Sequence, residues 1–139
     1  MRLPESARAL IGAGADATLV TLNPDGSPQV SVVWVAFRAG DDGDELLTAH
    51  LGEYRKVRNV RADGRVALTI LATESGPFMR PYLAVTGTAE VEEGGAPELL
   101  RELAATLAPT AGFPPADAPP GLITRIRIDR IGGIGPWTE

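Results

Sequence analysis

Apolar and polar residues alternate along most of this 139-residue chain, and the alternation predicts a protein built mainly of β-strands. Runs rich in β-branched residues predict strands at 17–22, 29–37, 46–51, 65–73, 82–93 and 122–131. In the last run, isoleucines at 126 and 128 alternate with arginines, and the parity shifts near Asp129. Six strands are therefore expected, the last with a change of face near Asp129.

The first two strands are predicted to form a hairpin. The residues between them include Asn23-Pro24-Asp25-Gly26, which suits a type I turn followed by a glycine bulge. Both faces of the second strand are largely apolar, since Val33 and Val35 share one face and Val32 and Trp34 the other. This strand is therefore expected to be central and covered on both sides, with Trp34 as a packing residue.

Three segments are predicted to be helical. Leucines at 99, 103 and 107 recur at helical spacing within 96–108, residues 4–13 open with a proline, and residues 53–63 follow the strand-breaking Gly52. Residues 74–81 are expected to form a loop, and the proline-rich residues 109–121 a connection. The pattern predicts a mainly β fold with peripheral α-helices, a six-stranded antiparallel β-barrel.

Composition narrows the class of protein. The formal net charge of −5 argues against broad nucleic-acid binding, and the absence of cysteine excludes disulfides and thiolate metal sites. No apolar run approaches the roughly 18 residues of a membrane span, and the first residues are too polar for a signal peptide. We expect one cytoplasmic domain over residues 1–139.

The sequence holds no self-sufficient catalytic set. His50 is the only histidine, and neither a Gly-x-Ser-x-Gly elbow nor a phosphate-binding loop is present. A zinc site cannot be assembled from one histidine and no cysteine, so no metal is expected. If the protein is an enzyme, the chemistry is expected to belong to an organic cofactor, and no catalytic side chain is assigned.

Positive charge gathers in one segment, residues 53–61, "EYRKVRNVR". It contains four of the thirteen basic residues, namely Arg55, Lys56, Arg58 and Arg61, and Lys56 is the only lysine. Because the segment follows a strand and a glycine, its helix N-terminus is a candidate anion site. Lys56 and Asn59, three residues apart, can reach the same spot. The segment is interpreted either as a phosphate clamp or as an arginine-rich face in solvent.

Four short motifs occur in a characteristic order. They are Gly26-Ser27-Pro28-Gln29-Val30-Ser31, Lys56-Val57-Arg58-Asn59, Asp63-Gly64-Arg65-Val66 and Gly87-Thr88-Ala89. Together they resemble, over about residues 5–135, the small split-barrel flavoproteins related to pyridoxamine 5'-phosphate oxidase. The resemblance is to the branch of F420 (deazaflavin)-dependent oxidoreductases and FMN binders. The third motif has Gly64 where that family often has proline.

The resemblance implies an FMN-binding type of split β-barrel that forms a homodimer with two cofactor sites at the subunit interface. It places the cofactor phosphate near Thr48, Ala49 and His50, held by Arg55 and Lys56 with Asn59 beside them. It places the ring along Gln29, Val30, Ser31 and Val32. The partner subunit would contribute Tyr82 and Trp137, although Trp137 is equally interpretable as an ordinary interface aromatic.

The resemblance also implies a function. It predicts an oxidoreductase that uses bound coenzyme F420 or FMN for hydride transfer to a small conjugated substrate. The main alternative is a non-catalytic protein that binds a flavin, haem or another anionic small molecule on the same barrel. A barrel that binds nucleic acid through the basic helix is disfavoured by the acidic charge and the few aromatic residues.

Overall fold

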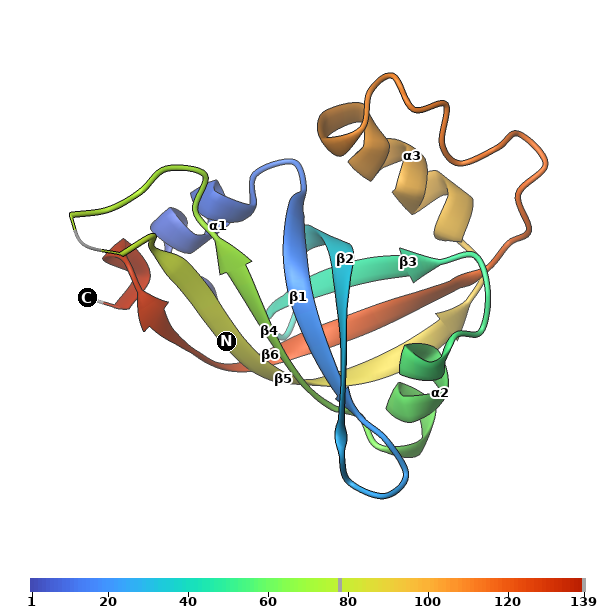
Figure 1. Cartoon of the computed structure of the whole chain (residues 1–139), viewed down its shortest axis with the longest axis horizontal. Helices are drawn as coiled ribbons and strands as arrows, with labels where there is room; N and C mark the ends of the chain where they lie inside the picture. Colours follow the sequence, from blue (N-terminus) through green and yellow to red (C-terminus); the bar gives the residue numbers. More distant parts are fainter. Residues whose placement is uncertain (78, 139) are drawn as a thin grey trace.

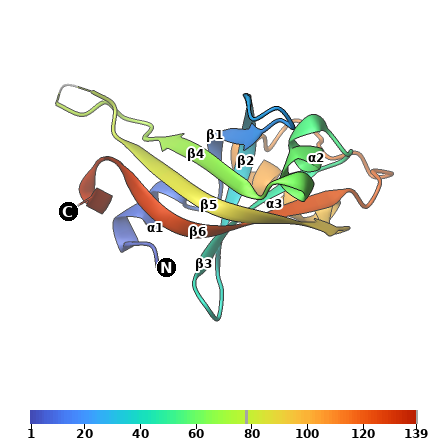
Figure 2. The ribbon, with the colours of Figure 1, turned by 90° about the horizontal axis from the view of Figure 1, so that it is seen from below.

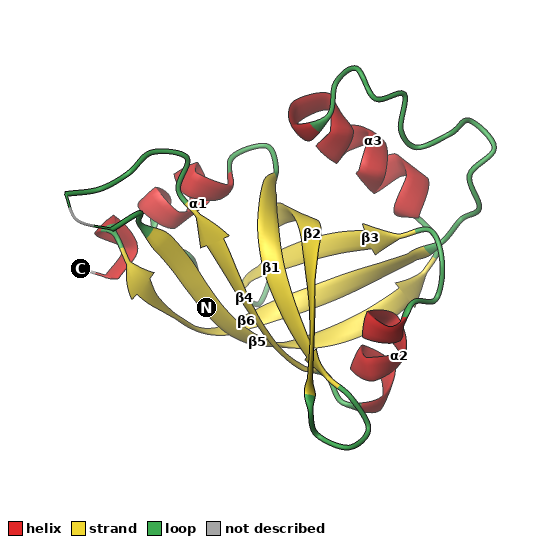
Figure 3. Ribbon diagram, in the orientation of Figure 1, coloured by secondary structure: helices red, strands yellow, loops and turns green. Residues whose placement is uncertain are grey.

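Six antiparallel strands form a closed barrel in the computed structural model, which describes residues 1–77 and 79–138 (Figures 1 and 3). The strands are β1 (Ala15–Leu22), β2 (Pro28–Ala39), β3 (Asp44–His50), β4 (Arg65–Leu71), β5 (Tyr82–Glu93) and β6 (Leu122–Ile134). Around the barrel their order is β1-β2-β3-β6-β5-β4. The predicted mainly β, six-stranded antiparallel barrel is confirmed. The loop predicted at 74–81 includes Phe78, which lies outside the described residues.

Two local predictions about the strands are confirmed. In the β1–β2 hairpin, the Gly26 N–H donates to the Asn23 carbonyl at 2.8 Å, and Gly26 has a φ of +87°, a conformation that favours glycine. Between β5 and β6, Thr86 pairs with Arg130 and Gly87 with Ile128. Asp129 is therefore the extra residue of a bulge, which explains why the alternation of β6 changes face there.

The barrel interior is filled by aliphatic side chains. The fully buried ones include Leu19, Val35, Leu46, Ile70, Leu83, Ile126 and Ile128. Helix α1 (Glu5–Ile11) and the short 3₁₀ helix η1 (Pro136–Thr138) close one end, where Ile11 and Trp137 join this core. Burying one such side chain contributes about 1.5–3 kcal/mol, so the interior is the main source of stability.

Helix α3 (Ala96–Leu107) packs on the outer surface of β2 and β3. Leu99 and Leu103 contact Ala36 and Leu47 there, in a second apolar cluster that also includes Trp34. The rest of the outer face of β2 is not covered by any described residue, since Val30 and Val32 are 60% and 69% exposed. Within a single chain, the expected cover on both sides of β2 is therefore present only over its second half, which α3 reaches.

Helix α2 (Arg55–Ala62) lies at the end of the barrel away from α1 and η1, as Figures 1 and 2 show. Its buried Val57 and Val60 attach it to the barrel, as predicted. The interior is polar at this end, where Thr21, Thr48, His50, Asn59 and Thr124 are all buried. The described residues include no helix with both the length and the apolar character needed to cross a membrane.

Candidate functional site

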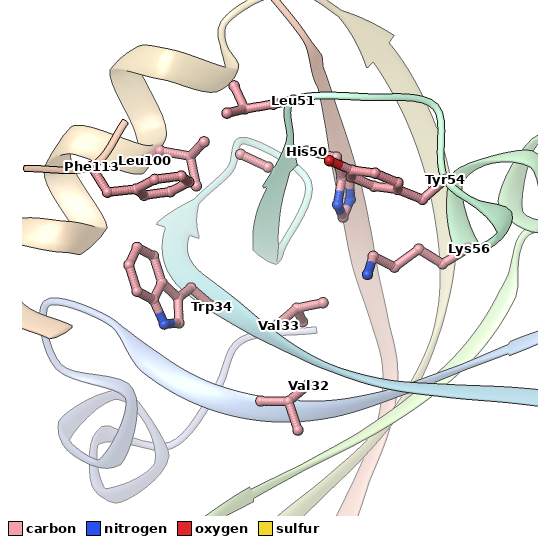
Figure 4. Close-up of a pocket in the computed structure, with 10 residues that line it drawn as sticks. Val32, Val33, Trp34, His50, Leu51, Tyr54, Lys56, Leu100 and Phe113 are labelled. Atoms are coloured by element: carbon pink, nitrogen blue, oxygen red, sulfur yellow. The ribbon is translucent and has the colours of Figure 1, made fainter. Parts of the chain in front are cut away.

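A cavity of about 310 Å³ lies where β2, the end of β3, α2 and α3 meet (Figure 4). One part of its wall is polar and contains His50, Tyr54 and Lys56. The other part is apolar. Its lining residues are Val32, Val33, Trp34, Ala49, Leu51, Leu100 and Phe113. The cavity therefore suits a ligand with an anionic end and a flat or apolar end.

Lys56 supplies the positive charge of the cavity. It belongs to the first turn of α2, and its ammonium extends into the cavity below His50 and Tyr54 in Figure 4. The Nζ atom lies 5.5 Å from the centre of the Tyr54 ring, within the range of a cation–π contact. Burial lowers the pKa of Lys56, because removal of water disfavours the charged ammonium. A bound anion would offset that penalty.

The N-terminus of α2 faces the same region. Tyr54 occupies the N-cap position, and no side chain in the described ranges caps the helix. The Val57 and Arg58 N–H groups donate to the Tyr54 carbonyl at 3.0 and 3.1 Å. Earlier N–H groups of a helix have no intrahelical acceptor, and the dipole adds partial positive charge there. Lys56 and the helix end therefore lie where both could hold an anion.

His50 is the second polar group of the wall. It is buried, and its Nε2 lies 3.1 Å from Thr124 Oγ1 on β6. Burial, with a smaller contribution from the charge of Lys56, lowers the pKa of His50 to about 4. The imidazole is therefore neutral at pH 7, able to donate or accept a hydrogen bond but not to act as a second cation.

Two buried hydroxyls on the strands that border the cavity lack hydrogen-bond partners among the residues that the structure describes. They are Ser31 Oγ on β2 and Thr48 Oγ1 on β3. Thr48 lies two residues before His50, on the same face of the strand. A buried hydroxyl without a partner typically costs about 1–3 kcal/mol, so such groups point to a partner that is not part of the chain. The polar groups present here therefore fit a phosphate-bearing ligand.

Four of the predicted cofactor-binding residues line the cavity together: Val32, Ala49, His50 and Lys56. Gln29 and Val30 lie nearer the hairpin turn and are not part of its wall. Gln29 accepts a hydrogen bond from Thr21 at 3.0 Å, and Val30 is largely exposed.

The remaining polar residues of α2 point elsewhere. Arg55 is exposed beside the hairpin turn, in a shallow pocket with Asn23 and Ser27. Asn59 is buried under the helix, and its Nδ2 donates to Thr21 Oγ1 and Asn23 Oδ1, each at 3.0 Å. The structure therefore separates Lys56 from both Arg55 and Asn59, which hold the hairpin side of α2.

Arg58 and Arg61 are both engaged with Glu53. Arg58 donates to the Glu53 carbonyl at 2.7 Å, and Arg61 forms an ion pair with its carboxylate at 2.6 Å. Both contacts are exposed, so they contribute little to stability. They hold the two arginine side chains beside Glu53, just before the first residue of α2.

Tyr82 and Trp137 lie at the opposite end of their own barrel, near α1 (Figure 1). Trp137 is 6% exposed, and its Nε1 donates to the Tyr82 carbonyl at 3.0 Å. Trp137 therefore packs within its own chain. The contribution of these residues to a partner's site stays a prediction.

Sequence reasoning missed much of the apolar wall. Trp34 was assigned to packing alone, and Leu51, Leu100 and Phe113 were not considered; Tyr54 of the polar part was missed as well. Leu100 and Phe113 come from α3 and from the proline-rich segment, far from β2 in the sequence. The one available signal was that Phe113 is the single large apolar side chain in residues 109–121.

The chain is similar to known proteins over nearly its whole length. The sequence profile described as pyridoxamine 5'-phosphate oxidase matches residues 3–134. A solved structure named F420 reductase is 26% identical, with a TM-score of 0.76 over 94% of this chain and 98% of that chain. No curated protein matches this chain significantly.

Two further solved structures share the fold at lower identity. An FMN-binding protein from Syntrophomonas wolfei is 19% identical, with a TM-score of 0.69 over 94% of this chain and 85% of that one. HupZ from Group A Streptococcus is 18% identical, with a TM-score of 0.68 over 98% and 97%. These structures show a shared fold, whereas the profile match over residues 3–134 shows the family. The chain therefore belongs to the pyridoxamine 5'-phosphate oxidase family.

Proposed function

We propose that this protein is an oxidoreductase that binds coenzyme F420 or FMN and transfers hydride to a small conjugated substrate. The observation that carries the proposal is the cavity itself, which joins a half-buried cation at a helix N-terminus to an apolar surface that begins at Val32 of β2. A flavin-type cofactor has the matching parts, a phosphate and a planar ring. Membership of the family and the 26% identity to a protein named F420 reductase support it.

Within this proposal, the whole chain, residues 1–139, is one cofactor-binding domain. Lys56 and the N–H groups of the first turn of α2 hold the phosphate, with His50 and the hydroxyl of Thr48 as neighbouring hydrogen-bond partners. The ring is proposed to leave the cavity at Val32 and to lie along the exposed Gln29–Val32 stretch of β2. When bound, the cofactor supplies the hydride chemistry at its ring. The side chains bind it, orient it and exclude water.

The side chains of the cavity have no assigned role in proton transfer. Because the pKa of His50 is low, its imidazole is neutral at pH 7 and is not a general acid there. In this proposal the ammonium of Lys56 is paired with the cofactor phosphate. A proton that the reaction needs is therefore proposed to come from solvent.

Titration of the purified protein with each cofactor tests this function. We expect F420 or FMN to bind with low-micromolar affinity or better, seen as a change in the visible absorption spectrum. The two differ in that F420 has a longer anionic tail, and Arg58 and Arg61 of α2, both in contact with Glu53, are proposed as the additional cations for it.

The possible results separate the candidate functions. If neither cofactor binds below high-micromolar concentration, the proposed function is wrong. Binding without turnover of any enone, quinone or tetrapyrrole would favour the non-catalytic binding protein instead.

We further propose that a second copy of the chain covers the outer face of β2, β1 and β4. In the pairing of β1 with β2, Val30 lies beside Val20. Thr18 of β1 lies between Val32 of β2 and Thr69 of β4. This face consists largely of small and β-branched residues. Because Val32 belongs both to the face and to the cavity wall, a second copy would sit at the edge of the cofactor site.

A charge placed in this face is expected to separate the subunits. Thr69→Arg introduces an arginine at an exposed position, so the fold is expected to survive while the homodimer dissociates. Light scattering coupled to gel filtration measures the mass. Thr106→Arg makes the same change on the exposed side of α3 and is expected to leave the dimer intact. A monomeric wild-type protein would contradict the proposed dimer.

A further inference from the structure

We propose that Trp34 and Phe113 select substrates by providing an aromatic subsite for a planar, uncharged ring. This inference rests on the proposed function, since it concerns the substrate of the same cavity. The pair belongs to the apolar part of the wall, on the side away from Lys56 (Figure 4).

The two rings form a corner. Their centroids lie 5.9 Å apart and their planes meet at 85°, an edge-to-face arrangement that favours both rings electrostatically. Leu100 of α3 lies beside them in the cavity wall. A flat ring entering the corner can stack on one aromatic face while its edge meets the other. A saturated or branched group cannot use the corner in this way.

Phe113 is placed there by the segment between α3 and β6, residues 108–121. Five of these residues are proline: Pro109, Pro114, Pro115, Pro119 and Pro120. The segment is attached at its end, where Gly94 N–H donates to the Gly121 carbonyl at 2.7 Å and Ala96 N–H to the Pro120 carbonyl at 3.0 Å. Proline restricts the backbone, so the segment holds Phe113 with little loss of entropy on binding.

Part of the Phe113 ring is accessible from the cavity. Phe113 is 40% exposed while its ring contacts Trp34 at the cavity, so an entering ring can reach it. The aromatic corner also lies beyond the stretch proposed for the cofactor ring. Trp34 follows Val32 by two residues on the same face of β2, which corresponds to about 7 Å. The corner is therefore left for the substrate.

The charge of the wall defines the class of substrate. The residues around the corner carry no charge: they are Val32, Val33, Leu51 and Leu100. Among the residues that the structure describes, the cation that lines the cavity is Lys56, at its other end. A charged group on the substrate ring would lose its water there without gaining a partner. The corner is therefore selective for uncharged conjugated compounds that carry a flat ring.

A matched pair of enones tests the inference. Benzylideneacetone carries a phenyl ring where 3-penten-2-one carries a methyl group, and the two are otherwise alike. Calorimetry on cofactor-loaded and cofactor-free protein gives the dissociation constant of each. We expect the wild type to bind the aryl enone at least tenfold more tightly, and Phe113→Ala to reduce that preference about tenfold. Phe113→Tyr, which keeps the ring, is expected to retain it.

Two further measurements locate the effect. Binding of the aryl enone is expected to change the fluorescence of Trp34, measured as the part of the signal that Trp34→Phe removes. The affinity for the cofactor is expected to stay within twofold in Phe113→Ala and in the loop control Thr110→Ala.

The outcomes separate this inference from the proposed function. An equal preference for the aryl enone in wild type and Phe113→Ala, with cofactor binding intact, would overturn the aromatic subsite and leave the oxidoreductase standing. A wild type without any preference would do the same. Cofactor binding that fails while the Phe113-dependent preference persists would overturn the oxidoreductase and support the subsite.

Discussion

Replacing Lys56 by alanine is expected to weaken cofactor binding by about 1.5–3 kcal/mol, a factor of roughly 10 to 150. Lys56 is the cation that reaches the cavity from α2, and it is already partly desolvated, so an anion at this position gains a charge-assisted contact at low cost. The dissociation constants of F420 and FMN, measured by spectroscopic titration of wild type and variant, give the effect directly.

The neighbouring residue provides the matched control. Arg55→Ala removes a positive charge from the same turn of α2, but Arg55 is exposed beside the hairpin. Its loss is expected to change the dissociation constant by less than threefold, mainly through long-range charge. Lys56→Arg is expected to restore part of the affinity. A larger effect from Arg55→Ala than from Lys56→Ala would place the phosphate on the hairpin side of α2 and contradict the site described above.

Protonation of His50 is expected to destabilise the cofactor-free protein by about 3 kcal/mol as the pH falls from 6.5 to 4. The pKa of His50 falls from its ordinary 6.5 to about 4 because burial disfavours the imidazolium, with Lys56 adding a smaller repulsion. Between these two pH values the unfolded chain binds a proton that the folded protein does not. The free energy of unfolding attributable to His50 is therefore intact above pH 6.5 and lost progressively toward pH 4.

Comparison with His50→Gln isolates this contribution from the carboxylates that titrate in the same range. Urea unfolding at several pH values is expected to show wild type losing about 3 kcal/mol relative to the variant between pH 6.5 and 4. Direct NMR titration of the imidazole gives the pKa itself, and Lys56→Ala is expected to raise it slightly. A measured pKa near 6.5 would mean that His50 is hydrated and does not line a desolvated cavity.

Local patterns predicted the strands and turns closely because they depend on neighbouring residues. The bounds of β5 agree with the prediction at both ends, and those of α3 differ by one residue. The turn at Asn23–Gly26 and the bulge at Asp129 follow from glycine conformation and strand alternation, which are visible in any short window of sequence. Closure of six such strands then follows from the cost of open edges.

The site was predictable only in part. Lys56 and His50 were found because they lie at the junction of a strand and a helix, where anions commonly bind. The separate positions of Arg55 and Lys56 could not be predicted. Adjacent helical residues point about 100° apart, and which of the two faces the cavity depends on how Val57 and Val60 seat the helix.

The sequence alone therefore determined a six-stranded antiparallel barrel, a basic helix after the third strand and a resemblance to one flavoprotein family. Only the tertiary structure decided which residues share the cavity. Phe113 and Trp34 are separated by most of the chain and meet because α3 packs on the outer face of β2 and β3. Contacts between distant residues depend on the packing of whole elements, which no local alternation of polar and apolar residues encodes.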